Sequence, residues 1–289
     1  MSNEQYRPQS FKVLPLVVKN LLIINVLFYL ATLIFERTQN IDLANYLGLH
    51  YFSSELFKPF QFVTYMFMHA TKDASGSFDI THILFNMFAL WMFGNVLENY
   101  WGSKRFLIFY IITGVGAAAV YLGYQAFQQH QVQEAVTYLT NNPSPENYIS
   151  LLQNRFGFFY EQPEFQQQVQ AFATDWSHHL SAPGYLTVAL NDIHQLQSYG
   201  INEPMVGASG AIFGILLAYG MLFPNTLLYV YFLIPIKAKY FVIIYGAIEL
   251  FMGIRNSPGD NVAHFAHLGG MLFGFIMIKY WQRNSKHFY

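Results

Sequence analysis

Apolar segments of membrane-spanning length constrain this chain more than any other feature of its sequence. A helix needs about twenty mostly apolar residues to cross a bilayer, where every backbone hydrogen bond must be satisfied internally. Six segments approach that length, at residues 16–35, 83–97, 106–127, 205–223, 240–254 and 262–281. The second and fifth are short, which requires a thin bilayer region or shelter by neighbouring helices. The sequence therefore predicts an all-α membrane protein with six transmembrane helices.

The composition agrees with that prediction and excludes several classes of function. Only 11% of the 289 residues are charged and 54% are hydrophobic, whereas about a quarter of a soluble domain is charged. The net charge of −1 argues against a protein that neutralises nucleic-acid phosphates. The chain has no cysteine, so disulfides, thiolate-bound zinc, iron–sulfur clusters and thiol nucleophiles are excluded. We expect neither a cofactor nor a metal.

The distribution of Lys and Arg predicts the orientation of the chain. Six spans place both termini on one side of the membrane, and ten of the fifteen Lys and Arg residues lie on that side. The positive-inside bias then places both termini in the cytoplasm. The first apolar run is too long for the apolar part of a signal peptide and is interpreted as a retained span. We expect an integral multi-pass protein of the bacterial cytoplasmic membrane.

The long polar stretch between the third and fourth predicted spans is interpreted as a helical extramembrane insertion. We assign residues 1–127 to the N-terminal tail and first three spans, 128–203 to the insertion, and 204–289 to the last three spans and the C-terminal tail. Apolar residues spaced by 4, 3, 4 and 4 predict an amphipathic helix that begins near Pro163: Phe165, Val169, Phe172, Trp176 and Leu180. Another helix is predicted to begin at Ser144 and Pro145. The apolar run 226–234 is interpreted as an interfacial segment.

Polar side chains occur in three predicted spans that run in the same direction. At a rise of about 1.5 Å per residue, Ser209 and His267 each lie about 6–8 Å below the starts of their spans. His82 and Asn86 are one helical turn apart at the start of the second span, so they share a face. We therefore expect a hydroxyl, an imidazole and an amide to converge at one shallow, water-accessible depth.

This combination fits hydrolysis by a serine nucleophile. A serine hydroxyl attacks efficiently only when a neighbouring base accepts its proton, and a neutral histidine can accept it. The oxyanion needs donors, for which His82, Asn86 and the backbone N–H of Ser209 are candidates. No Asp or Glu lies near these positions in the sequence, so a Ser–His dyad is expected rather than a triad. His264, one turn before His267, is a competing base.

Small residues around these positions predict close helix contacts. Gly207 and Gly210 flank Ser209, and Gly270 and Gly274 follow His267; small residues at such spacing allow two membrane helices to approach closely. Phe213 is expected to pack against the imidazole. The same residue types are common in ordinary membrane-helix packing, so the prediction of a site depends on the matched depth of the serine and the histidine.

The motifs that contain these residues resemble those of the rhomboid family of intramembrane serine proteases. The resemblance covers residues 15–127 and 204–282 and rests on five motifs in order, at 59–69, 82–86, 102–106, 207–210 and 266–274. It implies a six-transmembrane-helix rhomboid-like bundle, with Ser209 as nucleophile, His267 as general base and acid, and His82 with Asn86 in the oxyanion hole. It also implies single-span membrane proteins as substrates, cut near the outer membrane face. Residues 240–254 resemble the family's lateral gate, and 253–261 its cap. The lengthened loop at 71–80 and the insertion depart from the family pattern.

Other functions remain as alternatives. The sequence has no His-Glu-x-x-His zinc motif and no paired aspartate motifs. The pairs His130 with Glu134 and His178 with His179 are interpreted as solvated surface, and Glu249 as a structural hydrogen-bonding residue. A catalytically silent relative that binds or chaperones transmembrane segments is the second hypothesis. The insertion is either a structural cap or a substrate-recruiting element.

Overall fold

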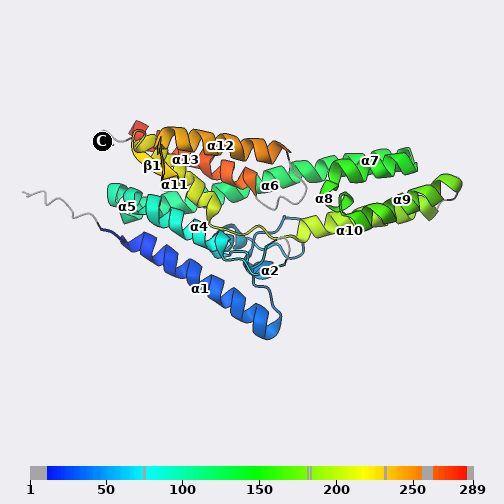
Figure 1. Cartoon of the computed structure of the whole chain (residues 1–289), viewed down its shortest axis with the longest axis horizontal. Helices are drawn as coiled ribbons and strands as arrows, with labels where there is room; N and C mark the ends of the chain where they lie inside the picture. Colours follow the sequence, from blue (N-terminus) through cyan, green and yellow to red (C-terminus); the bar gives the residue numbers. More distant parts are fainter. Residues whose placement is uncertain are drawn as a thin grey trace, which may run out of the picture.

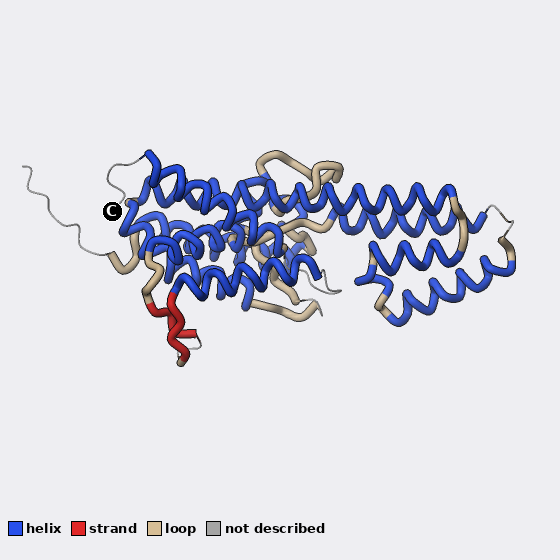
Figure 2. The backbone as a smooth tube through the Cα atoms, turned by 90° about the horizontal axis from the view of Figure 1, so that it is seen from above, coloured by secondary structure: helices blue, strands red, loops and turns tan. Residues whose placement is uncertain are grey.

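The computed structural model of the chain describes residues 12–73, 76–180, 182, 184–230, 233–255 and 263–284. These residues are mostly helical, and the molecule is elongated (Figure 1). One end holds a bundle of long helices, and the other holds a group of shorter helices that corresponds to the predicted insertion (Figure 2).

Five of the six predicted spans each lie on one helix. These helices are α1 (Leu16–Gln39), α6 (Ser103–Asn141), α11 (Ser209–Leu222), α12 (Ala238–Arg255) and α13 (His264–Asn284). By length and composition, α1 and α6 are the described helices that could cross a membrane, and α11 is a shorter apolar helix. The count of six membrane crossings therefore stays a prediction.

The second predicted span lies on a helical run with a change of geometry in its middle. The run consists of α4 (Thr81–Ala89), the π-helical segment η2 (Leu90–Gly94) and α5 (Asn95–Trp101). At its far end, the carboxylate of Glu98 accepts hydrogen bonds from the backbone N–H groups of Val17 and Val18 at 2.9 and 2.8 Å. The first-turn N–H groups of α1 have no acceptor inside their own helix, so Glu98 fixes the start of α1 against α5.

Helix α11 lies at the centre of the bundle and packs against α6, α12 and α13. Its residues are mostly buried, whereas α1 and α12 keep apolar side chains exposed on their outer faces, such as Leu27, Ile243 and Phe251. A soluble protein rarely exposes so much contiguous apolar surface. This distribution is that of a bundle whose outer helices contact lipid.

Glycines allow α11 and α13 to pack with their backbones in contact. A methyl group on Gly270 would lie 1.8 Å from the carbonyl oxygen of Gly210, and one on Gly274 would lie 3.2 Å from the Cα atom of Gly214. Any larger residue at position 270 would therefore push the two helices apart. This contact brings the first turns of both helices together.

Short elements connect the long helices. Between α1 and α4 lie α2 (Ala44–Leu47), α3 (Gln61–Thr64) and the 3₁₀ turn η1 (Tyr65–Phe67). The segment 226–234, which was interpreted as interfacial, contributes to a two-stranded antiparallel hairpin, β1 (Leu227–Val230) and β2 (Ile234–Lys237). The hairpin lies at the end of the molecule opposite the shorter helices (Figure 2).

The group of shorter helices has its own buried core. It comprises the last turns of α6 together with α7 (Pro145–Arg155), α8 (Gly157–Tyr160), α9 (Pro163–His178) and α10 (Gly184–Asn202). The core includes Tyr148, Leu152, Val169, Trp176 and Ile193. Helix α6 runs without a break through residues 127 and 128, so it extends from the bundle into this second core.

Both helix starts predicted in this region are confirmed. Ser144 caps α7, with its Oγ accepting from the N–H of Asn147 at 3.1 Å, and Pro163 begins α9. Along α9, Val169 and Trp176 are buried. Leu180 is the exception in the apolar pattern, because it lies beyond the end of α9 and is 65% exposed.

We expect Gly270→Ala to lower the unfolding temperature of the detergent-solubilised protein, because the added methyl group overlaps the Gly210 carbonyl and overpacking costs about 1–3 kcal/mol. Gly123→Ala is the matched control, since a methyl group at Gly123 in α6 meets nothing within 4 Å. Replacing an open helical glycine with alanine stabilises a helix by about 1 kcal/mol. Equal unfolding temperatures for the two variants would contradict the close contact.

Candidate active site

Ser209 and His267 are in hydrogen-bonding contact. The Oγ atom of Ser209 lies 2.8 Å from Nε2 of His267. His267 is one turn into α13 and 7% exposed, whereas Ser209 is the first residue of α11. The hydroxyl and the imidazole therefore come from two neighbouring helices that the glycine contact holds together.

The prediction that the fourth span begins near Met205 is wrong, and with it the depth assigned to Ser209 within its helix. Residues before Ser209 are extended: the backbone of Met205 exchanges two 2.9 Å hydrogen bonds with Leu49. Gly207 has a φ of 127°, which glycine adopts without strain. Helix α11 therefore starts four residues later, and Ser209 stands at its N-terminus.

Contacts with the connection between α1 and α4 hold this extended segment in place. The N–H of Gly207 donates to the carbonyl oxygen of Tyr65 at 3.0 Å, and the hydroxyl of Tyr65 donates to the carbonyl oxygen of Gly114 at 2.7 Å. The N–H of Ser209 belongs to the first turn of α11, where backbone donors have no acceptor within the helix. A helix N-terminus of this kind favours negative charge.

His82 lies beside Ser209 at the start of α4. A methyl group on Gly207 would lie 3.1 Å from Nε2 of His82 and 3.4 Å from Oγ of Ser209, so the ring and the hydroxyl border the same small space. The ring of His69 packs edge-on against His82 at a centroid distance of 5.0 Å. Burial, together with the neighbouring His82, lowers the pKa of His69 to about 3, so this ring is uncharged at neutral pH.

Asn86 follows His82 by one turn on α4 and is 7% exposed. Among the described residues, its Nδ2 atom is buried without a hydrogen-bond partner. A buried amide without a partner is costly, so an unsatisfied donor near a polar cluster is available to a bound group. The sequence predicted this residue as an oxyanion donor, and the geometry leaves its N–H groups available for that role.

Aromatic rings hold the imidazole of His267. The rings of Phe213 and His267 stack with centroids 4.1 Å apart and planes 9° apart. Tyr245 of α12 stacks with Phe213 in turn, at 5.2 Å and 8°. The sequence suggested the contact with Phe213, but no pattern in it pointed to Tyr245, which comes from a separate helix.

The expectation that no carboxylate lies near the serine and histidine is wrong. Oε2 of Glu249 lies 2.8 Å from Nδ1 of His267 and 2.7 Å from Nδ1 of His264. Glu249 precedes His267 by eighteen residues and belongs to α12, so proximity in the sequence did not reveal it. The available signal was an acidic residue in an apolar span, which requires a partner. His264, the competing base, hydrogen-bonds this carboxylate instead.

One group of described residues has side chains that could bind a metal ion: Glu249, His264 and His267. Their ligand atoms lie within 4.8 Å of one another. Zinc sites made of two His and one Glu are known, and the bonds from the ion to its ligand atoms are about 2.0–2.1 Å long. Around a tetrahedral ion, bonds of this length place neighbouring ligand atoms about 3.3 Å apart. The observed separations of 2.7 and 2.8 Å are those of hydrogen bonds.

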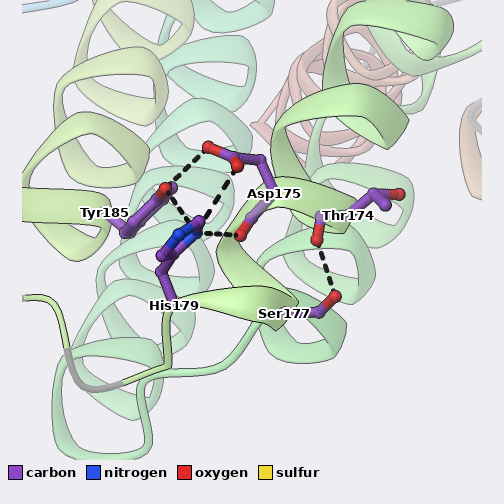
Figure 3. A network of polar contacts seen from close by, with 5 residues as sticks. All are labelled: Thr174, Asp175, Ser177, His179 and Tyr185. Carbon is purple, nitrogen blue, oxygen red and sulfur yellow. Dashed lines mark hydrogen bonds and ion pairs between the residues drawn. The ribbon is translucent and has the colours of Figure 1, made fainter.

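The other histidines singled out in the sequence lie on the surface of the insertion. His130 and Glu134 are both exposed, with Nδ1 and Oε1 3.8 Å apart. His179 joins a network at the end of α9 in which the Tyr185 hydroxyl donates to Asp175 at 2.6 Å (Figure 3). These contacts tie α10 to the end of α9, which is a structural role. The predicted cap at 253–261 lies largely outside the described residues.

Comparison with known proteins identifies one family. A family model described as the Rhomboid domain matches residues 56–135 and 178–283, which together make up more than half of the chain. The matched residues include Ser209, His267, His82, Asn86 and Glu249. Residues 136–177, in the group of shorter helices, fall outside the match. No curated protein matches the chain.

Proposed function

The chain belongs to the rhomboid family, a family of intramembrane proteases that also has inactive members, and from this premise we propose that it is an active intramembrane serine endopeptidase. The observation that carries the proposal is the 2.8 Å hydrogen bond between Ser209 Oγ and His267 Nε2. A silent relative that only binds transmembrane segments would not require a hydroxyl and an imidazole in contact.

In the proposed reaction, Ser209 is the nucleophile and His267 the general base. As Oγ attacks the carbonyl carbon of the scissile bond, its proton passes to Nε2 of His267. The same proton then goes to the nitrogen of the leaving amine as the C–N bond breaks. A water molecule hydrolyses the acyl-enzyme by the same two steps. Stacking on Phe213 keeps the ring oriented in both halves of the reaction.

The oxyanion of each tetrahedral intermediate is stabilised by three donors: the N–H of Ser209 at the start of α11, the side chain of His82 and the free amide of Asn86. The positive end of the α11 dipole adds to this stabilisation. We further propose six membrane crossings with both termini in the cytoplasm. The substrates are then single-span membrane proteins cut near the outer face, on the same side as the insertion 128–203.

We expect Ser209→Ala and His267→Ala each to abolish cleavage of a transmembrane reporter protein in proteoliposomes, because either change removes the nucleophile or its base. Ser198→Ala and His130→Ala are matched controls on the exposed insertion and should cleave at the wild-type rate. Cleavage is followed by gel electrophoresis of the reporter. Undiminished cleavage by Ser209→Ala would overturn the catalytic assignment. Reporter binding without cleavage by the wild type would favour the silent relative.

Asn86→Ala should lower kcat by about 10²–10³-fold, the usual cost of losing one oxyanion donor. Asn25→Ala is the control, because Asn25 is also a buried asparagine but bonds to the backbone of α1 at 2.7 Å. That variant should change thermal stability and leave kcat unaltered. If both variants lower kcat equally, Asn86 contributes only to folding.

We propose that the insertion is dispensable for the chemistry, because it has a separate core. Gln129 and Gln197 are in side-chain contact at 2.7 Å, so a short glycine linker can replace residues 130–196. The shortened protein should still cleave a reporter substrate. Loss of a natural substrate alone would indicate recruitment by the insertion, and loss of both activities would indicate that it serves as a structural cap.

A further inference from the structure

Among the residues that the structure describes, Glu249 is the acidic residue whose carboxylate contacts the candidate catalytic pair, Ser209 and His267. Glu249 is 6% exposed, and its Oε2 atom contacts Nδ1 of His267 and Nδ1 of His264 at 2.8 and 2.7 Å. A charge buried at membrane depth is expensive unless it is paired. Two imidazole donors on one oxygen provide that pairing, and both come from the first turn of α13.

This arrangement determines where the protons of His267 lie. An ionised carboxylate can only accept hydrogen bonds, so Nδ1 of His267 carries a hydrogen and donates it to Glu249. In the neutral ring, Nε2 is then an acceptor, and it faces the hydroxyl of Ser209 at 2.8 Å. The other tautomer would present an N–H to the serine and could not accept its proton. Glu249 therefore selects the one tautomer that is competent as a base.

We propose that Glu249 is a positioning residue that completes a Ser209–His267–Glu249 triad, an inference that rests on the proposed protease function. When Oγ of Ser209 bonds to the carbonyl carbon, the carbonyl electron pair moves to its oxygen and the serine proton moves to Nε2. His267 is then an imidazolium with protons on both nitrogens, and Glu249 stabilises its charge without accepting a proton. Transfer of the Nε2 proton to the leaving amine restores the neutral ring.

His264 has a supporting part in this arrangement. Its Nδ1 donates to the same oxygen of Glu249, so it fixes the direction of the carboxylate from a position one turn before His267. The side chains of His264 and Glu249 are 11% and 7% exposed, so few water molecules compete for the carboxylate. The carboxylate is thus oriented from two sides before the imidazolium forms.

The test compares Glu249→Gln with Glu249→Asp and a matched control. Glutamine keeps the size and an acceptor but removes the charge, whereas aspartate keeps the charge on a shorter stem. Glu98→Gln is the control, because Glu98 is 2% exposed and also holds backbone N–H groups, but in the contact between α5 and α1. Each variant is measured for kcat and KM on a reporter substrate, for unfolding temperature, and for labelling of Ser209 by a fluorophosphonate probe.

We expect Glu249→Gln to lower kcat by about 10²–10⁴-fold at a similar KM, by analogy with loss of the carboxylate charge from a serine-protease triad. The rate of Ser209 labelling should fall in parallel, and Glu249→Asp should recover part of both. Glu98→Gln should lower the unfolding temperature while kcat and labelling stay at wild-type values. A folded Glu249→Gln protein with wild-type kcat and labelling would overturn the triad.

Failure of the triad is distinguishable from failure of the protease function. If Ser209→Ala abolishes cleavage and Glu249→Gln leaves kcat at the wild-type value, the pair acts as a dyad and only the triad is wrong. If the wild type cleaves no reporter, Ser209 labelling still reports whether Glu249 activates the serine, and absent labelling overturns both proposals. Addition of a chelator such as EDTA should leave kcat unchanged. Loss of activity on chelation would show that Glu249, His264 and His267 bind a metal, which also overturns the triad.

Discussion

The backbone contact between α11 and α13 is the constraint on which the rest of the site depends. Gly270 approaches the carbonyl oxygen of Gly210 so closely that even a methyl group would overlap it. Ser209 is adjacent to Gly210 on α11, and His267 precedes Gly270 by one turn on α13. The same backbone contact therefore holds Oγ of Ser209 2.8 Å from Nε2 of His267.

Around that contact, the chain uses apolar helices to shield a small set of polar groups. Stacked rings of Phe213 and Tyr245 cover one side of His267, and Glu249 binds its Nδ1 atom. In a low-dielectric environment, each of these polar groups is stabilised only if it has a partner. The amide of Asn86 is one described exception, and a donor without a partner in such a place is suited to a charge that develops during a reaction.

Periodicity and residue type predicted much of this structure. Apolar run length located all six helical segments of the bundle, and the family match confirms the rhomboid resemblance carried by the motifs around Ser209 and His267. Cap and proline signals located the starts of α7 and α9.

The differences between the predicted and the observed structure have physical causes. The apolar residues 205–208 fit the pattern of a helix, yet Met205 pairs with Leu49 and Gly207 donates to the carbonyl oxygen of Tyr65, so the helix begins only at Ser209. The strands β1 and β2 were not predicted, because runs of four residues are too short for a period of two to be recognised.

By itself, the sequence determined the helical segments, the family, and the serine and histidine placed near the ends of two helices, because these features follow from local composition and spacing. Only the tertiary structure decided that Glu249 meets His267, that Tyr245 stacks with Phe213, and that a second core forms between α6 and the helices that follow it. The physical reason is the same in each case. A contact between helices depends on the rotation and offset of both, and spacing along one helix does not specify which face of another it will meet.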